Sequence, residues 1–284
     1  QTPTLNADIT AAPISLTGLT GDDKIYDSTT VASLTGSAAV TPISGDTLNV
    51  ISGTADFSDK NVGTAKTINL NGYSLGGTDA GNYSLQVPTL SADITPVSVT
   101  LNGLNANHKI YDTTTTANLN GIASVAVLGT DNLLVDSGSA AADFSDKNVG
   151  NGKNVTLSGY SLSGTDAANY NLQLPTLTAD ITPADVILNG LTANNRVYDA
   201  TTVASTTGIA AVTALSGDDL SVDTLSANAA FSDKNAGSGK AVTLAGYTLT
   251  GVDAGNYQLQ TPTLNADITA APISLTGLTG DDKI

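Results

Sequence analysis

The chain of 284 residues contains no cysteine, tryptophan or methionine, and only three phenylalanines and one histidine. Without cysteine, a disulfide framework and any thiolate metal site are excluded. Cys-His catalysis is excluded for the same reason, and the one histidine, His108, is replaced by Asp23 and Asn195 at the equivalent positions of related segments. We therefore expect His108 to be a surface loop residue, and the chain not to be an enzyme.

Glutamate is also absent, so all 26 acidic residues are aspartate, and with ten basic residues the formal net charge is −16. This acidity argues against nucleic acid as a partner, because nucleic-acid binding needs a positive surface. It would also repel anionic membranes. No stretch approaches the ~20 apolar residues of a membrane span, so we expect no membrane insertion by this segment.

What the chain does contain is repetition. Residues 1–25 return letter for letter as residues 260–284, and the Asp of an ADIT tetrapeptide recurs at Asp8, Asp93, Asp180 and Asp267, a period of 85 to 87 residues. The period predicts three repeat domains, residues 11–96, 97–183 and 184–270. Residues 1–10 are then the last strand of a preceding repeat, and residues 271–284 the first strand of a following one.

The large side chains obey the same period, so we assign them a structural role in each domain. The tyrosines fall into three equivalent sets and the phenylalanines into one: Tyr26, Tyr111 and Tyr198; Tyr73, Tyr160 and Tyr247; Tyr83, Tyr170 and Tyr257; Phe57, Phe144 and Phe231.

Short stretches of alternating apolar and polar residues, separated by Gly, Asp and Asn turns, predict an all-β fold with no long helix. The D-x-[G/A]-x-Y motif at Asp79–Tyr83 has the form of a tyrosine corner, in which the hydroxyl bonds backbone across the turn of an immunoglobulin-like sandwich. We therefore predict a tandem array of small Ig-like β-sandwiches, with β-grasp-like, mostly-β domains as the alternative. Proline soon after each ADIT and a linker of two to four residues predict a stiff, elongated rod.

In each unit the motifs KIYD-x-TT, FSDKNVG, GY-x-L, DAGNY and ADITPA occur in this order, with small changes. This series resembles the YDG-type domain, one of the glycine-rich, mostly-β MBG repeats of large bacterial surface proteins similar to filamentous-haemagglutinin-like adhesins. The glycine of the YDG name is Ser28, Thr113 or Ala200 here, so we expect no strict need for a positive φ at that position.

The resemblance implies structural stalk or spacer repeats of a giant secreted bacterial adhesin or extracellular matrix fibre, at the cell surface or in the matrix, supporting adhesion or biofilm. The expected partners are neighbouring repeats of the same chain, together with like filaments or surface glycans. The alternative is that each repeat is a weak glycan-binding or self-association module that acts by avidity. Exposed tyrosine faces would favour that alternative.

Two site hypotheses remain, and no cofactor other than calcium is a candidate. Calcium ligands would come from the acidic turns, although Ala230 replaces an acid in the third copy and ordinary turn capping explains the same residues. The candidates are Asp56, Asp59, Asn61, Asp143, Asp146 and Asn148. The second hypothesis is an isopeptide cross-link from Lys60, Lys147 or Lys234, against which we favour a surface ion pair that contributes little.

Overall fold

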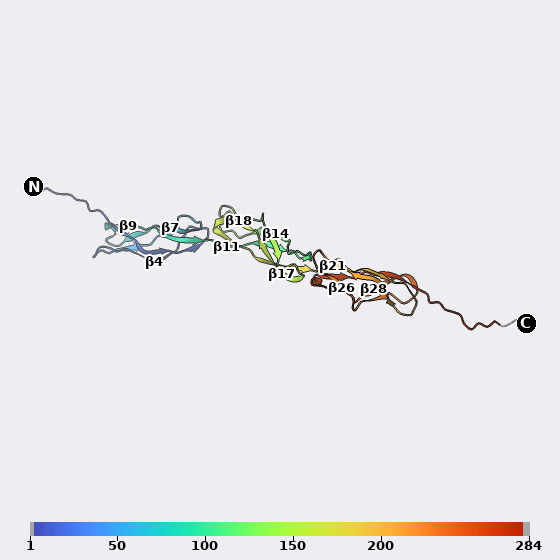
Figure 1. Cartoon of the computed structure of the whole chain (residues 1–284). Helices are drawn as coiled ribbons and strands as arrows, with labels where there is room; N and C mark the ends of the chain where they lie inside the picture. The colour runs from blue at the N-terminus through green and yellow to red at the C-terminus, as the bar shows by residue number, and fades with distance from the viewer. Residues whose placement is uncertain (1–2, 281–284) are drawn as a thin grey trace. The chain divides into compact units, whose positions relative to one another are not determined.

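The computed structural model describes residues 3–280, and these confirm an all-β chain of tandem sandwich repeats (Figure 1). Within these residues the helices are three single 3-10 turns, and no helix is long and apolar enough to cross a membrane. The first repeat consists of β1 (Ala12–Ser15), β2 (Thr17–Gly21), β3 (Lys24–Ile25), β4 (Leu34–Ala39), β5 (Asn49–Ile51), β6 (Thr54–Phe57), β7 (Gly63–Asn71), β8 (Ser74–Gly76), η1 (Ala80–Asn82), β9 (Tyr83–Gln86) and β10 (Leu90–Thr95).

The chain divides into two compact units, and the division runs through the second repeat rather than between repeats. The first unit comprises Gln1–Leu104, Gly121–Ala140 and Leu157–Pro175; the second comprises Asn105–Asn120, Ala141–Thr156 and Thr176–Ile284. Each unit therefore contains one complete repeat, part of the second repeat, and the junction that joins them.

In the first repeat, the main sheet has the strand order β3-β10-β7-β6. Strands β6, β7 and β10 pair antiparallel, and β3 pairs parallel with β10. Because side chains alternate between the faces of a sheet, Phe57, Ile68 and Ile94 all point inward, and each is at most 3% exposed. These side chains form the floor of the repeat's core.

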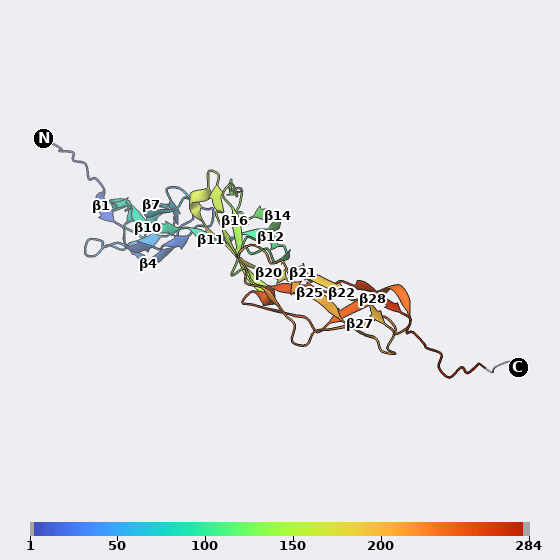
Figure 2. The same cartoon turned by 45° about the vertical axis from the view of Figure 1, so that its right-hand side comes forward.

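The other face of the repeat is built from strand pairs. β1 pairs parallel with β9, while β2–β4 and β5–β8 are antiparallel. In both views β4 and β7 lie on opposite sides of the repeat (Figures 1 and 2). Ile14 of β1 and Leu16, just after it, are 7% and 2% exposed, because they close the core from this side.

Glycine is required where β2 and β4 approach each other at a bulge. Gly18 and Gly36 have φ of 83° and 93°, and a Cβ on Gly36 would lie 2.0 Å from the carbonyl oxygen of Gly18. No other residue fits this approach, which explains why a glycine stands at both positions in every repeat.

The other two repeats reuse this plan. The second contains β11 (Val97–Thr100), β12 (Asn102–Ala106), β13 (Lys109–Ile110), β14 (Leu119–Ser124), β15 (Leu134–Asp136), β16 (Ala141–Phe144), β17 (Gly150–Ser158), β18 (Ser161–Ser163), η2 (Ala167–Asn169), β19 (Tyr170–Gln173) and β20 (Thr176–Thr182). The third contains β21 (Ala184–Ile187), β22 (Asn189–Ala193), β23 (Arg196–Val197), β24 (Val203–Ala204), β25 (Thr206–Ala211), β26 (Ser221–Asp223), β27 (Asn228–Phe231), β28 (Gly237–Ala245), β29 (Thr248–Thr250), η3 (Ala254–Asn256), β30 (Tyr257–Gln260) and β31 (Leu264–Thr269).

The linkers between repeats are shorter than the sequence predicted. Only Pro96 separates β10 from β11, and only Pro183 separates β20 from β21. In the first unit the apolar core also continues across the junction, because Tyr26 and Phe57 belong to one buried cluster with Val99, Leu133 and Tyr170. The chain thus passes from one repeat into the next with a single residue outside the strands.

Candidate functional site at the repeat junction

The first part of the site is the loop of residues 24–31, which fixes Tyr26. Lys24 Nζ donates to Asp27 Oδ1 and to the Thr29 carbonyl, both at 2.8 Å, and Asp27 Oδ1 accepts the Thr29 N–H at 2.9 Å. These bonds close the loop on itself, so its polar groups are satisfied locally. Tyr26 is thereby held at the end of the repeat, where only 2% of it is exposed.

The residue after that aspartate has a left-handed backbone in every repeat, so our expectation that a positive φ is not required there is wrong. The φ angles are 65° at Ser28, 70° at Thr113 and 68° at Ala200. The loop closure by Lys24 and Asp27 imposes this conformation, at a cost of about 1–2 kcal/mol for a residue with a Cβ.

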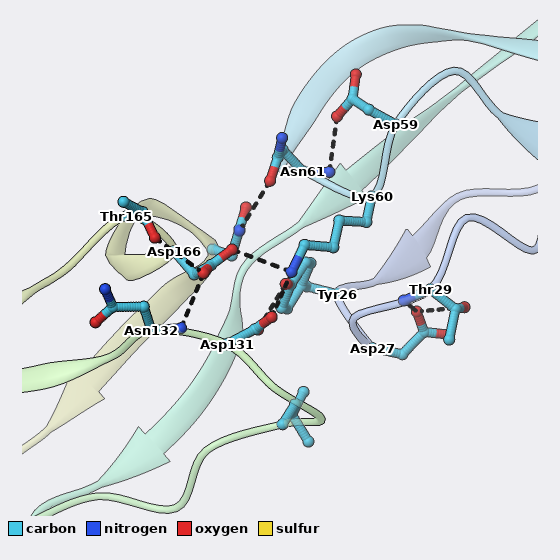
Figure 3. A network of polar contacts seen from close by, with 12 residues as sticks. Tyr26, Asp27, Thr29, Asp59, Lys60, Asn61, Asp131, Asn132, Thr165 and Asp166 are labelled. Atoms are coloured by element: carbon cyan, nitrogen blue, oxygen red, sulfur yellow. Dashed lines mark hydrogen bonds and ion pairs between the residues drawn. The ribbon is translucent and has the colours of Figure 1, made fainter.

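The second part of the site is the FSDKN turn, which presents Lys60. Asp59 Oδ1 accepts the Asn61 N–H at 2.8 Å and a bond from Lys66 Nζ at 2.6 Å. An aspartate that bonds a backbone N–H two residues later makes a tight turn. Lys60, between Asp59 and Asn61, is therefore directed away from its own repeat (Figure 3).

This geometry also shows where the calcium candidates lie. Asp56, on β6, accepts bonds from Thr30 and Asn71, whereas Asp59 is occupied by Asn61 and Lys66. Asp143, Asp146 and Asn148 repeat these positions, with Asp146 bonded to Lys153 at 2.7 Å. Among residues 3–280, no group of three or more His, Cys, Asp or Glu side chains could hold a metal ion.

The third part comes from the DAANY motif of the second repeat. Its 3-10 turn, η2, places Tyr170 so that its hydroxyl accepts the Leu128 N–H at 3.0 Å and donates to Asp131 Oδ2 at 2.7 Å. The hydroxyl does bond backbone, as expected of a tyrosine corner, but the bonded residue lies about forty positions upstream rather than a few. The motif therefore anchors the loop that carries Asp131.

Asp131 is the centre of the assembled site (Figure 3). Its carboxylate accepts hydrogen bonds from Lys60 Nζ and, at 2.6 Å, from the Tyr26 hydroxyl. It also accepts one from the Tyr170 hydroxyl. Lys60 Nζ also lies 3.1 Å from Asp166 Oδ1, and Asp166 is fixed by the Asn132 N–H at 2.9 Å. Two donors come from the first repeat and one from the second, so a single carboxylate joins the two.

Asn169 adds a neutral pair of bonds beside this ion pair. Its Oδ1 accepts the Val62 N–H at 2.9 Å, and its amide nitrogen donates to Asn61 Oδ1 at 3.1 Å. Asn169 is only 3% exposed. Buried amides are costly unless bonded, and here both the oxygen and the nitrogen of the side chain bond the preceding repeat.

Aromatic packing completes the junction. The rings of Tyr26 and Tyr170 meet edge to face, with centroids 5.5 Å apart, and Lys60 Nζ lies 5.8 Å from the Tyr26 ring centroid. Such aromatic and cation–π contacts each contribute about 0.5–1.5 kcal/mol. They also exclude water from the Asp131 carboxylate.

The environment shifts the pKa values in the direction that keeps the ion pair charged. Burial alone would raise the pKa of Asp131, but the bonds from Lys60, Tyr26 and Tyr170 outweigh it and lower that pKa. The hydrogen bond to Asp131 is the main reason why the pKa of Lys60 is raised. Burial, followed by the bond to Asp131, raises the pKa of Tyr170 to about 12.

These observations correct the expectation that Lys60 forms a surface ion pair that contributes little. The Asp131 side chain is 1% exposed and that of Lys60 is 33% exposed, so the charged hydrogen bond between them is worth about 1.5–3 kcal/mol rather than the 0–1 kcal/mol of an exposed pair. The raised pKa of Lys60 also opposes an isopeptide bond, because amide formation needs the uncharged amine.

The second unit contains the same site between the second and third repeats. Asp218 accepts bonds from Lys147 Nζ at 2.8 Å, from Tyr111 at 2.7 Å and from Tyr257 at 2.6 Å. These bonds lower the pKa of Asp218 to about 2 against the opposing effect of burial. Asn256 Oδ1 accepts the Val149 N–H at 2.9 Å, as Asn169 does for Val62.

The remaining structural candidates are buried or half-buried. The three phenylalanines are each 3% exposed, and Tyr26, Tyr111, Tyr170 and Tyr257 are buried. The other tyrosines are half-buried: Tyr73, Tyr83, Tyr160, Tyr198 and Tyr247. Lys234, the counterpart of Lys60, is exposed and has no ion-pair partner among residues 3–280.

Sequence reasoning missed the central carboxylate. Asp131 and Asp218 read as ordinary turn residues, although an aspartate stands at the equivalent position in each repeat, Asp46 in the first. The structural role of His108 was also missed. Its Nδ1 accepts the Asp180 N–H at 2.8 Å, and Asp23 and Asn195 accept the equivalent N–H groups in the other repeats, so three different side chains perform one structural task.

Comparison with known proteins agrees with this repeat plan. Residues 10–92, 95–179 and 182–264 each match the YDG domain, so the chain belongs to the YDG domain family and carries three successive copies of it. No curated protein matches the sequence.

Two solved structures align with most of this chain, but with low sequence identity and low TM-scores. One is the three-Ig structure of titin domains I67–I69 in an E-to-A mutated variant, at 10% identity and a TM-score of 0.24, covering 93% of this chain and all of that one. The other is domains 4–9 of the surface layer protein SbsC, at 11% identity and a TM-score of 0.14, covering 91% of this chain and 47% of that one. Both scores are too low to establish a shared fold.

Proposed function

We propose that this chain is a spacer segment of a giant secreted bacterial adhesin or extracellular matrix fibre, in which the repeats project a binding region and support adhesion or biofilm. The observation that carries the proposal is the recurrence of one buried, charged junction between successive repeats. Lys60 reaches Asp131 in the first unit, and Lys147 reaches Asp218 in the second.

The junction supplies stiffness because bending it would break buried polar contacts. Rotation about Pro96 would separate Lys60 from Asp131 and the Val62 N–H from Asn169. Leaving one of these buried groups unpaired costs about 1–3 kcal/mol, and more when it is charged. A stiff junction, repeated along an array, gives a rod whose length is set by the number of repeats.

The strand directions within a repeat suit mechanical load. The opening strand β1 is parallel to β9, and β3 is parallel to the closing strand β10. Tension between the two ends of a repeat therefore slides paired strands along each other. Their hydrogen bonds share the load and are not opened one at a time.

The proposal includes a bacterial, extracellular location and a role without catalysis. The family membership and the absence of cysteine from the sequence support this placement, because a chain exported unfolded through an oxidising compartment must not form disulfides on the way. The net charge of −16 would keep parallel rods apart.

The test compares matched lysine variants in solution scattering. The double variant Lys60→Gln, Lys147→Gln should shorten the maximum dimension and broaden the distance distribution, because both ion pairs are lost. The control Lys234→Gln removes the equivalent lysine, which has no ion-pair partner among residues 3–280, and should leave the curve unchanged. If the double variant scatters like the control, the ion pairs do not stiffen the chain and the proposal fails.

A second candidate, weak glycan binding, is favoured by one observation. Tyr73 of the first repeat lines an open groove of about 450 Å³, and Tyr247 of the third lines one of about 420 Å³. Half-buried tyrosine faces of this kind could stack on sugar rings. Binding of the chain to a glycan array, abolished by Tyr73→Ala together with Tyr247→Ala, would support this function; no binding would remove it.

A further inference from the structure

The two open grooves beside Tyr73 and Tyr247 occupy one position in the repeat plan. Leu34 and Tyr73 line the groove of the first repeat, and their counterparts Thr206 and Tyr247 line that of the third. All the residues that line a groove belong to a single repeat. The first repeat is followed by another repeat and the third is preceded by one, so a neighbour on either side leaves the groove open.

A strand edge without a partner faces each groove. Among residues 3–280, β4 pairs only with β2, and β5 pairs only with β8. Ser33 accepts the Asp22 N–H at 3.0 Å, so the N–H and carbonyl of the next residue, Leu34, point away from β2 by the alternation of an antiparallel pair. No described residue outside β2 makes a hydrogen bond to the backbone of Leu34. The equivalent bond in the third repeat, at 2.9 Å, leaves the edge at Thr206 free in the same way.

The chain blocks the neighbouring strand edge but not this one. In the first repeat, Lys24 Nζ donates to the carbonyls of Thr29 and Val31, at 2.8 and 3.0 Å, where the chain pairs with the outer side of β6. Arg196 does the same in the third repeat. A cation on unpaired carbonyls prevents a further strand from pairing there. None of the described residues that line the two grooves is basic, so the edge at Leu34 lacks this protection.

The grooves offer apolar contacts and favour a positively charged occupant. Val31 in the first groove is 63% exposed and Ile209 in the other is 84% exposed, so large apolar side chains stand in water beside the free edge. Among the described lining residues the one charged side chain is Asp56, and the whole chain has a net charge of −16. Charge complementarity therefore selects a cationic partner and disfavours a second copy of this acidic chain.

We propose that each groove binds an extended, positively charged polypeptide segment of another protein, which adds a strand to the free edge of β4, or of β25 in the third repeat. Backbone hydrogen bonds to the edge supply the affinity, and alternate side chains of the segment contact the tyrosine ring and Val31 or Ile209. Two such grooves on one chain add avidity for a partner with several segments. This binding role goes beyond the spacer role and does not depend on it.

The probe is a fluorescent peptide of about nine residues in which lysine and valine alternate, titrated with the full chain and followed by fluorescence anisotropy. We expect saturable binding that weakens at least tenfold when the backbone nitrogens of the peptide are methylated, because tenfold is the worth of one or two backbone hydrogen bonds. A peptide of alternating glutamate and valine should not bind. Equal binding of the methylated and unmethylated peptides would show that no strand pairing occurs, and would overturn the proposal.

Matched lysine variants locate the binding site. Ile122 is the counterpart of Ile209 in the second repeat and is also 84% exposed. The groove variant places one lysine in each repeat, and should weaken binding of the lysine–valine peptide at least tenfold: Val31→Lys, Ile122→Lys and Ile209→Lys. The control variant adds the same charge at exposed apolar positions outside the groove linings, and should bind as the unmodified chain does: Ile25→Lys, Ile110→Lys and Val197→Lys. Equal effects of the two variants would mean unspecific charge attraction and would overturn the proposal.

Hydrogen exchange measured by NMR reports on the strand edge directly. The Leu34 amide should exchange rapidly in the free chain and slow down when the peptide is bound, with the Thr35 amide, which bonds within the β2–β4 pair, as the reference. A Leu34 amide that stays unprotected at saturating peptide would overturn the proposal. Binding of glycans but not of the peptide would assign the grooves to sugars instead. None of these outcomes affects the scattering test of stiffness, so the two proposals fail separately.

Discussion

The sharpest prediction concerns Asp131→Asn. The substitution keeps the shape of the side chain but removes the charge that accepts from Lys60, Tyr26 and Tyr170. The two hydroxyls can still donate to the amide oxygen, whereas the amide nitrogen then faces Lys60. We expect a loss of about 2–4 kcal/mol, mostly from the charged bond, which is worth about 1.5–3 kcal/mol.

Asp46→Asn is the matched control, because Asp46 accepts the Tyr83 hydroxyl but no lysine among the described residues. The control should cost about 1 kcal/mol or less. The difference between the two variants therefore isolates the contribution of the bonds that cross between repeats, with the local tyrosine bond subtracted.

The assay is calorimetric melting of the full chain, together with a double-mutant cycle between Lys60→Gln and Asp131→Asn. A loss of 2–4 kcal/mol corresponds to a fall of roughly 5–10 °C for a cooperative unit of this size. The cycle should give a coupling energy of about 1.5–3 kcal/mol. Equal effects of Asp46→Asn and Asp131→Asn, or a coupling energy near zero, would refute the idea of a junction that locks the repeats together.

Four further results are expected. Thr113→Gly should stabilise the chain by about 1 kcal/mol, because it relieves a β-branched residue at a φ of 70°; a loss of stability in urea unfolding would contradict this. Because the pKa of Asp218 is about 2 in the folded chain and higher when unfolded, its stabilisation should be complete above pH 4 and disappear as the pH falls through 2, and Asp218→Asn should flatten the melting profile in that window. Asn169→Ala should speed hydrogen exchange of the Val62 amide measured by NMR, with the Val149 amide as an unaffected reference, since its own acceptor Asn256 is intact. A calcium chelator should leave the melting temperature unchanged, because the acidic turns are filled by their own lysine and backbone donors; a downward shift would restore the calcium hypothesis.

The fold was largely predictable from the sequence because its signals are local. Buried residues such as Phe57 and Ile68 alternate with more exposed ones along β6 and the second half of β7, which is the pattern that predicted half-buried strands separated by turns. The parallel pairing of β1 with β9 was not predictable, because about seventy residues separate these strands and their sequences carry no signal of direction.

The junction was not predictable for a related reason. Lys60 and Asp131 are 71 residues apart, in different repeats, and each lies in a loop whose composition is fully explained by turn formation. Only the folded chain shows that the turn at Asp59 directs Lys60 outward while the tyrosine corner brings Asp131 to meet it. The positive φ at Ser28 was missed because the residue identity suggested the opposite backbone.

Variation among the three repeats separates the residues that join repeats from those that only close loops. Asp56 becomes Ala230 in the third repeat, and Asp23 becomes His108 or Asn195, each of which accepts the equivalent backbone N–H. By contrast the lysine, tyrosines, asparagine and aspartate of the junction are the same in every copy. Each repeat carries the donor half at one end and the acceptor half at the other, so any repeat can follow any other and the array has a direction. A protein assembled this way lengthens by adding units, because the contact that joins them is already present on both faces.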